Sequence, residues 1–257
     1  MSPARATSPR MKAAPPLPSA GAAWALFLDV DGTLVGFNDD PDMVEVPAGL
    51  QATLTALHDA LGGALALVSG RRLYDLDRLF GPPLVAAAGL HGLQRRRNDG
   101  SEEDMQPDPD VVDALHRHVA ALAARLPHMR VEDKGICIAL HYRETPLQEH
   151  AVIAGACRIA RQLPGYETQA GNHIIEIKPA GVDKGYAVKA FLDEAPFIHR
   201  LPVYLGDDLT DEHAFAAVNA HDGISIRVGD REPSRAHYTL RHPSAVQAWL
   251  EGVLVHL

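Results

Sequence analysis

The chain has 257 residues, of which 46% are hydrophobic and 22% charged, and its formal net charge is −9. This length predicts either one large domain or a core that carries an inserted module. No run of apolar residues is long enough to span a bilayer, and the acidic balance lacks the broad basic face that nucleic acid or an anionic membrane requires. We therefore expect a soluble, folded protein that binds neither nucleic acid nor membranes.

The cysteines and the N-terminal segment indicate the compartment. Cys137 and Cys157 form neither a CxxC pair nor the pattern of a secreted disulfide scaffold, which favours a reducing environment. Residues 1–22 are rich in Pro, Ser and Ala and contain no apolar segment followed by a cleavage site. We predict a disordered tail over residues 1–22, a cytoplasmic location and a monomer.

Strands and helices alternate from residue 23 to residue 104. The predicted elements are a strand at 24–30, a helix at 48–61, a strand at 64–69, a helix at 71–79 and a strand at 84–88. This alternation is typical of a parallel α/β sheet. The polar stretch at 95–109 that follows predicts a connection between modules.

A different order of elements follows this connection. We predict a helix at 109–126, strands at 130–132 and 136–142, a helix at 146–163, and strands at 166–169 and 173–178. After residue 183 the alternation resumes, with a helix at 184–192, a strand at 202–205, a helix at 211–217, a strand at 223–228 and a helix from 243. The sequence therefore predicts an α/β core of residues 23–104 and 183–257, interrupted by an inserted α+β module of residues 105–182.

Polar residues gather where the predicted core strands end. The first strand ends in DVDGT, which places Asp29 and Asp31 two residues apart. Ligands of open α/β sheets bind at this edge, although Asp-Gly alone is equally typical of a turn. Neither GxGxxG nor GxxxxGK[ST] follows any strand, so the dinucleotide-binding and P-loop classes are excluded.

Three further motifs occupy equivalent positions. Ser69 ends the second strand, where a helix N-cap is the alternative interpretation. Lys184 begins a helix, and because its charge opposes the helix dipole we expect an anionic partner. Asp207, Asp208 and Asp211 follow a later strand in GDDLTDE, and carboxylates this close together predict a bound cation.

The four motifs together supply what phosphoryl transfer requires. One carboxylate can attack phosphorus to form an aspartyl-phosphate, while Mg²⁺ and a lysine neutralise the phosphoryl oxygens and a hydroxyl orients them. Each motif alone has a structural explanation, but their order and spacing favour this chemistry.

DVDGT at 29–33, SGR at 69–71, Lys184 and GDDLTDE at 206–212 resemble the four motifs of the haloacid dehalogenase superfamily. Over residues 24–250 the chain is similar to the trehalose-6-phosphate phosphatase family. The resemblance implies a Rossmannoid parallel-sheet core of the haloacid dehalogenase type with an inserted α+β cap of type 2 (C2B). It also implies Mg²⁺-dependent hydrolysis of trehalose 6-phosphate to trehalose and phosphate, a step of trehalose biosynthesis.

The resemblance assigns roles to the core residues. Asp29 would be the nucleophile, and Asp31 the general acid that later activates water. Ser69 and Lys184 would hold the phosphate. The substrate-binding set also includes Gly70, Arg71 and His91, the last from an HG dipeptide. The metal site would consist of Asp29, the backbone carbonyl of Asp31 and Asp207, with Asp208 and Asp211 supporting its water ligands.

Three residues of the inserted module complete the substrate site by the same resemblance. Glu132, Lys134 and Glu176 would bind the sugar, because carboxylates and an amine can satisfy vicinal hydroxyls. The alternative for these residues is an exposed charged hairpin. We interpret the arginines at 95–97 as a solvated basic run.

Two alternative functions stay open at this point. One is a sugar phosphatase of the same cap type that acts on sucrose phosphate or a mannosyl-phosphoglycerate, since the core motifs barely distinguish these substrates. The other is a sugar-phosphate sensor without turnover, which the complete set of expected catalytic groups disfavours.

Overall fold

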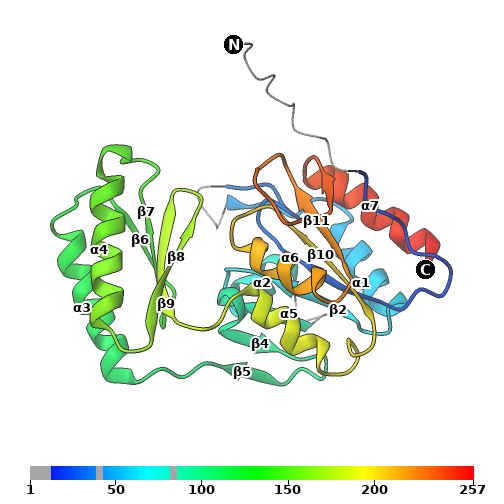
Figure 1. Ribbon diagram of the computed structural model, residues 1–257, viewed down its shortest axis with the longest axis horizontal. Coiled ribbons are helices and arrows are strands. Elements are labelled where there is room, and N and C mark those ends of the chain that lie inside the picture. The colour runs from blue at the N-terminus through cyan, green and yellow to red at the C-terminus, as the bar shows by residue number, and fades with distance from the viewer. Residues whose placement is uncertain (1–12, 39–42, 82–85) are drawn as a thin grey trace, which may run out of the picture.

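The computed structural model describes residues 13–38, 43–81 and 86–257. Within them a large sheet carries helices on both faces, and a smaller sheet beside it carries two helices on its outer face (Figure 1). The strands of the large sheet lie in the order β12-β11-β10-β1-β2-β3-β4-β5, and those of the small sheet in the order β6-β7-β9-β8. We call the large sheet with its helices the large unit, and the small sheet with α3 and α4 the small unit.

The large sheet is parallel from β12 to β3 and antiparallel at β4 and β5. Its strands are β1 (Trp24–Leu28), β2 (Leu65–Val68), β3 (Ala86–Gly89), β4 (Gln94–Arg96), β5 (Glu102–Asp104), β10 (Leu201–Gly206), β11 (Ile224–Val228) and β12 (Tyr238–Leu240). Every residue of β1 is buried, as expected for a central strand that is covered on both faces.

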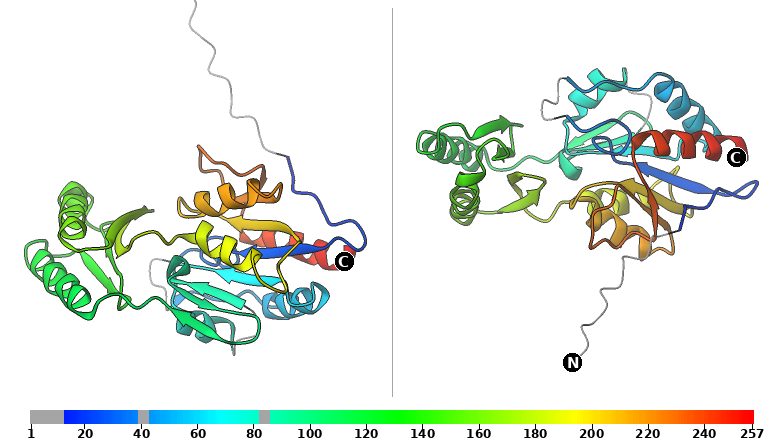
Figure 2. Two further views of the ribbon diagram at one scale, coloured as in Figure 1. Left: turned by 60° about the horizontal axis from the view of Figure 1, so that its bottom comes forward. Right: turned by 90° about the horizontal axis from the view of Figure 1, so that it is seen from above.

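Helices cover the two faces of the large sheet (Figure 2). One face carries α1 (Leu50–Ala60), α2 (Leu73–Phe80) and α7 (Pro243–His256), and the other carries α5 (Lys184–Leu192) and α6 (Asp211–Asn219). The chain moves outward from β1 in both directions, so right-handed crossovers place α1 and α6 on opposite faces. The four motifs singled out in the sequence all fall at the carboxyl edge that this topology creates.

The small unit has a core of its own. Its antiparallel strands are β6 (Arg130–Asp133), β7 (Ile138–His141), β8 (Tyr166–Gly171) and β9 (Ile174–Pro179), and its helices are α3 (Pro109–Ala123) and α4 (Glu149–Gln162). Leu115, Leu140 and Val152 lie in its apolar cluster, and the free face of the sheet is turned toward the large unit (Figure 1). All these elements fall within residues 105–182, whose assignment as a separate domain stays a prediction.

The stretch predicted as a connection contains most of β4 and all of β5, which is the edge strand of the large sheet. The arginines there are paired, which corrects the prediction of a solvated basic run. Arg96 is 4% exposed and donates to both carboxylate oxygens of Asp77, at 2.8 and 2.9 Å, and Arg95 donates to Glu194 at 2.6 Å. Edge strands tolerate charged side chains, so they lack the apolar pattern by which strands are recognised.

Part of the predicted tail lies against the large unit. Trp249 Nε1 donates to the carbonyl of Pro16 at 3.3 Å, and Pro15 and Pro18 are buried. Because Trp249 lies on α7, residues 13–22 include a segment bonded to this helix, which the prediction of a disordered tail did not anticipate. Residues 1–12 and the first two positions of the strand predicted at 84–88 lie outside the described residues.

The remaining elements differ from prediction mainly at their ends. β12 was absent from the predicted elements because its three residues are only half-buried and give no apolar run. None of the helices in the described ranges combines the length and apolarity that crossing a bilayer requires.

The aromatic centre of the large unit generates a stability prediction. The Phe27 ring lies 6.1 Å from that of Phe191 and 5.4 Å from that of Phe197. Phe27→Ala removes these contacts and should lower the free energy of unfolding by about 3–5 kcal/mol. Val255→Ala, at an 82% exposed position, serves as the control and should change it by less than about 0.5 kcal/mol. Urea unfolding followed by tryptophan fluorescence measures both, and equal effects would contradict the packing described.

Candidate active site

A cavity of about 910 Å³ lies between the two units, and side chains from both line it. The large unit contributes residues at strand ends, namely Asp29 and Asp31 after β1, Ser69, Gly70 and Arg71 after β2, His91 after β3, Lys184 at the start of α5, and Asp207 and Asp208 after β10. The small unit contributes Glu132, Lys134 and Glu176. Apart from Asp211, every residue predicted for the site therefore lines this one cavity.

The turn after β1 requires glycine. Gly32 has a φ of +79°, and a Cβ there would lie 2.1 Å from Asp207 Oδ2. The tight turn brings Thr33 back to the strand end, where its hydroxyl lies 3.0 Å from Asp29 Oδ2 and 3.4 Å from Asp207 Oδ1. The DVDGT motif thus brings the ends of β1 and β10 into contact.

Lys184 connects the first and last motifs. Its Nζ donates to Asp29 Oδ1 at 2.6 Å and to Asp211 Oδ1 at 2.7 Å. Burial would lower the pKa of Lys184, but the charges of Asp211 and Asp29 outweigh it and raise that pKa. The anionic partner expected for a lysine at a helix start is therefore this pair of carboxylates.

Asp211 is fully buried and fully bonded. In addition to Lys184 it accepts a hydrogen bond from the Tyr204 hydroxyl at 2.7 Å and one from the backbone N–H of Asp208 at 2.8 Å. Burial and the charge of Asp211 raise the pKa of Tyr204 well above its usual value, so this hydroxyl stays a donor. Asp211 fixes the loop that presents Asp207.

Three carboxylates form a site that fits a cation. Oxygens of Asp29, Asp207 and Asp211 lie within 4.8 Å of one another. Burial and the charge of Asp211 raise the pKa of Asp29 to about 7, while burial and the charge of Asp29 raise that of Asp207 to about 9. One lysine does not balance this negative charge, and an all-oxygen donor set is the type that Mg²⁺ prefers.

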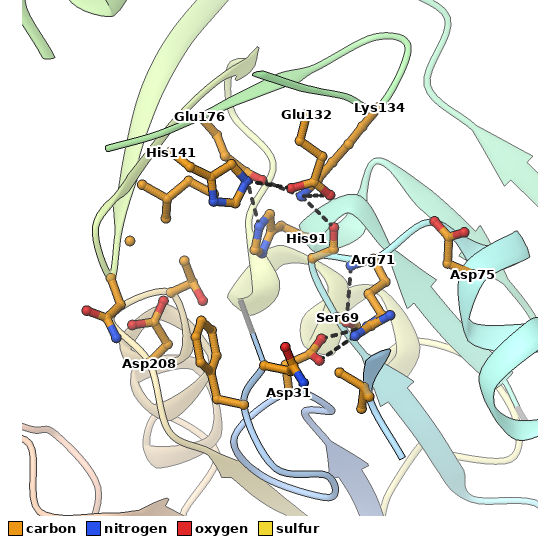
Figure 3. A pocket seen from close by; sticks show the side chains of 18 of the residues that line it. Asp31, Ser69, Arg71, Asp75, His91, Glu132, Lys134, His141, Glu176 and Asp208 are labelled. Carbon is orange, nitrogen blue, oxygen red and sulfur yellow. Dashed lines mark hydrogen bonds and ion pairs between the residues drawn. The ribbon is translucent and has the colours of Figure 1, made fainter. Parts of the chain in front are cut away.

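Two residues predicted for the metal site have other side-chain partners. Both oxygens of Asp31 accept hydrogen bonds from Arg71, from Nε at 2.8 Å and from Nη2 at 2.7 Å (Figure 3). Asp208 lies apart from Asp31 in the same view, and its Oδ1 is 3.1 Å from Arg231 Nη2. Within the described residues the three-carboxylate cluster contains neither of them, and a role for the Asp31 carbonyl stays a prediction.

The loop after β2 has the predicted residues but one unexpected contact. Ser69 is 1% exposed, and its Oγ accepts a hydrogen bond from the backbone N–H of Arg71 at 3.1 Å. This bond fixes the hydroxyl at the strand end. Arg71 lines the cavity and bonds to Asp31, and two parallel bonds of this type hold a carboxylate in a defined orientation, while its binding of substrate stays a prediction.

The residues from the small unit are bonded to one another and to the large unit. Lys134 Nζ donates to Glu176 Oε1 at 2.6 Å and to the carbonyl of Gly70 at 3.1 Å, and Glu132 Oε2 lies 2.8 Å from His141 Nε2. Glu176 is 5% exposed, so the alternative of an exposed charged hairpin is wrong for Lys134 and Glu176. Glu132 also has a lowered pKa, because the bond from His141 and the charge of Lys134 outweigh its burial.

Sequence reasoning missed three residues of this site. Thr33 could have been found, because it belongs to the DVDGT motif and lies four positions after Asp29. Tyr204 stands in an apolar strand and gives no sign of a polar partner. The contact of His141 with Glu132 depends on the register of β6 and β7, which the sequence does not reveal.

Comparisons with known proteins agree with this geometry. The family model described as trehalose-phosphatase matches residues 27–244. A trehalose-6-phosphate phosphatase of Escherichia coli (strain K12) is 40% identical over 240 residues, which cover 93% of this chain and 90% of that protein. A probable trehalose-phosphate phosphatase of Sinorhizobium fredii is 42% identical over 214 residues, covering 82% and 80%.

A solved structure shows the same fold. The C-terminal domain of the Candida albicans trehalose-6-phosphate phosphatase superposes with a TM-score of 0.80, covering 91% of this chain and 93% of that one at 20% identity. The fold is that of the haloacid dehalogenase phosphatases, as predicted. From the extent of the family match and the identity to the bacterial relatives, we conclude that this chain belongs to the trehalose-phosphatase family.

Proposed function

We propose that the protein hydrolyses trehalose 6-phosphate to trehalose and phosphate in a Mg²⁺-dependent reaction. One observation carries the proposal: Asp29 and Lys184, which bond to each other, line the same cavity as Glu132, Lys134 and Glu176 of the small unit. The names of the bacterial relatives support the same substrate. The reaction would take place in the cytoplasm, with the protein acting as a monomer.

Asp29 acts as the nucleophile in this proposal. Its carboxylate is held by Lys184 on one oxygen and Thr33 on the other, so its orientation is fixed before substrate arrives. Attack on phosphorus breaks the bond to the sugar oxygen and gives an aspartyl-phosphate, which water then hydrolyses. Ser69 and Lys184 provide a hydroxyl and a positive charge for the phosphoryl oxygens.

Asp31 is the group that moves protons. Its protonated carboxyl group first gives a proton to the departing sugar oxygen. The resulting carboxylate then regains a proton from the attacking water. Arg71 occupies both oxygens of Asp31, so the guanidinium must release at least one of them before that oxygen can reach the sugar. The incoming phosphate offers Arg71 an alternative anionic partner.

Asp29 and Asp207 would hold Mg²⁺, with Asp211 beside them and the carbonyl of Asp31 as a further ligand. A divalent cation there would counter the negative charge that otherwise raises the pKa values of Asp29 and Asp207. It would also neutralise charge on the phosphoryl oxygens.

The small unit, residues 105–182, acts as a cap that selects the sugar. Its three charged residues can satisfy hydroxyls that an apolar wall would leave unpaired. Phosphate release from a panel of sugar phosphates, with Mg²⁺ and with excess EDTA, tests the substrate. Equal release from sucrose phosphate or mannosyl-phosphoglycerate would favour the other sugar phosphatases, and binding without release would favour a sensor.

The first prediction from the proposed function concerns Asp29 as the nucleophile. Asp29→Asn keeps the size of the side chain but removes the attacking charge, so kcat should fall by several orders of magnitude while the protein stays folded. Phosphate release under single-turnover conditions measures the loss, and circular dichroism checks the fold. Substantial activity in a preparation free of other phosphatases would remove Asp29 from this role.

The second prediction concerns the metal. Asp207→Asn should sharply raise the Mg²⁺ concentration needed for half-maximal activity, because Asp207 belongs to the carboxylate cluster. Asp208→Asn is the matched control, and its shift should be smaller because Asp208 lies outside the cluster. A Mg²⁺ titration of activity, together with calorimetric titration of the metal, measures both. Equal shifts in the two variants would contradict the assignment.

The third prediction concerns sugar recognition. Glu132→Gln should lower kcat/KM for trehalose 6-phosphate by roughly ten- to 150-fold, the cost of losing a hydrogen bond to a charged group. A small aryl phosphate makes no sugar contacts and should be hydrolysed as before. Glu144→Gln is the control, since Glu144 also lines the cavity but is exposed. Parallel losses on both substrates would mean that Glu132 stabilises the small unit instead.

A further inference from the structure

Three polar contacts join the small unit to the large unit beside the cavity. His91 Nε2 lies 3.0 Å from Glu176 Oε2, Lys134 Nζ donates to the carbonyl of Gly70 at 3.1 Å, and Arg72 donates to the carbonyl of Asp133. Figure 3 shows His91 between Ser69 of the large unit and Glu176 of the small unit. Two of the three contacts thus involve a residue assigned to sugar binding.

The backbone holds His91 in one position. The residue has a φ of 59°, its N–H donates to the carbonyl of Ser69 at 2.9 Å, and the adjacent Leu90 N–H donates to the carbonyl of Arg71 at 2.8 Å. A Cβ at Gly70 would lie 2.7 Å from His91 Cε1, so the ring rests directly on that glycine. The loops after β2 and β3 therefore present the imidazole as a fixed group.

In the contact between the units, the His91 ring faces the charged carboxylate of Glu176. Burial lowers the pKa of His91, which keeps the ring neutral. The charge of Lys134 and the contact with His91 outweigh burial and lower the pKa of Glu176. In the described part of the chain His91 Nδ1 and Glu176 Oε2 are both buried without a regular hydrogen bond, although Nε2 lies 3.0 Å from Oε2. A ring proton on Nε2 lets these two groups attract each other, whereas a proton on Nδ1 would leave both unpaired.

We propose that His91 is a positioning residue, which holds Glu176, and through it Lys134, in the orientation that binds the sugar when the small unit rests on the large unit. Lys134 donates to one oxygen of Glu176, and His91 Nε2 lies 3.0 Å from the other. The sugar-binding pair is thus oriented by a residue of the other unit. This inference rests on the proposed function and changes the expectation that His91 binds substrate itself.

Sugar recognition and closure of the two units then become one event. When the units separate, Glu176 loses His91, Lys134 loses the Gly70 carbonyl, and neither keeps the orientation described. Hydrolysis of sugar phosphates would depend on this assembly, because the sugar hydroxyls meet oriented groups only in the closed arrangement. A small aryl phosphate, which needs only the large unit, would depend on it much less.

Two substitutions at His91 separate the effect of its contact with Glu176 from the effect of its backbone conformation. His91→Leu removes the donor at similar size, whereas His91→Gln places an amide N–H near the position of Nε2. We expect His91→Leu to lower kcat/KM for trehalose 6-phosphate by roughly ten- to 150-fold, the range for a lost bond to a charged group, and His91→Gln to recover most of it. The loss on an aryl phosphate should be clearly smaller.

His199→Leu is the matched control for strain. His199 also has a left-handed φ, of 63°, but is exposed and lies outside the residues that line the cavity. The two leucine variants should lose similar stability from backbone strain, and His199→Leu should keep the wild-type preference for the sugar phosphate. If His199→Leu lost the preference for the sugar phosphate to the same extent, backbone strain and not the His91–Glu176 contact would be the cause.

A double-mutant cycle tests the partner. In a Glu176→Gln background, His91→Leu should cost far less than in the wild type, because the carboxylate that it positions is absent. Independent losses that multiply, or an equal loss on both substrates, would overturn the proposal.

Distances between spin labels give a readout that needs no substrate. Labels at Leu147→Cys in the small unit and Val255→Cys in the large unit lie at exposed sites, and Cys157→Ser removes the more accessible native thiol. His91→Leu should broaden the distance distribution and His91→Gln should restore it. If the wild type shows no preference for trehalose 6-phosphate, the proposed function fails, and this measurement still decides the role of His91; an unchanged distribution would refute it.

Discussion

Lys184 lies almost fully buried between Asp29 and Asp211, and the rest of the site depends on this shared ion pair. Removing three charges from water is costly, so such a group persists only where further hydrogen bonds satisfy it. Thr33 bonds to Asp29, and Tyr204 bonds to Asp211. The bonds join β1, β10 and α5, so the architecture of the sheet edge and the orientation of Asp29, the proposed nucleophile, are set together.

The same charges explain why this edge suits a metal-assisted phosphatase. Burial raises the pKa of both Asp29 and Asp207, the charge of Asp211 adds to the shift of Asp29 and the charge of Asp29 to that of Asp207, and Lys184 compensates only part of the negative charge. A carboxylate that must attack phosphorus needs to be ionised, and a divalent cation beside it favours that form. The proposed chemistry and the proposed metal dependence would thus both follow from one electrostatic imbalance.

Specificity has a different physical origin, since it is distributed over two units that meet at the cavity. The small unit supplies the charged groups that we propose bind the sugar, but Gly70 and His91 of the large unit contact two of them. Contacts between units can break and re-form, whereas the buried ion pair at Lys184 stays within the large unit. The reaction centre is therefore permanent, while the sugar site would be assembled on closure.

The sequence by itself determined the elements with strong local signals and the motifs at their ends. The helix that begins at Lys184 and the strand that ends before Asp29 were predicted because buried apolar runs and helical spacing are local properties. The strands β4 and β5 were not predicted, because their charged residues give no apolar pattern, and the bound segment 13–22 was not, because Trp249 is distant in sequence. Tyr204 and Asp211 are close in sequence, but nothing in an apolar strand indicates that its tyrosine bonds to the next helix. Only the tertiary structure decided that Arg71 pairs with Asp31 and that His91 reaches Glu176, because these contacts join strand ends or units whose meeting depends on sheet order and register.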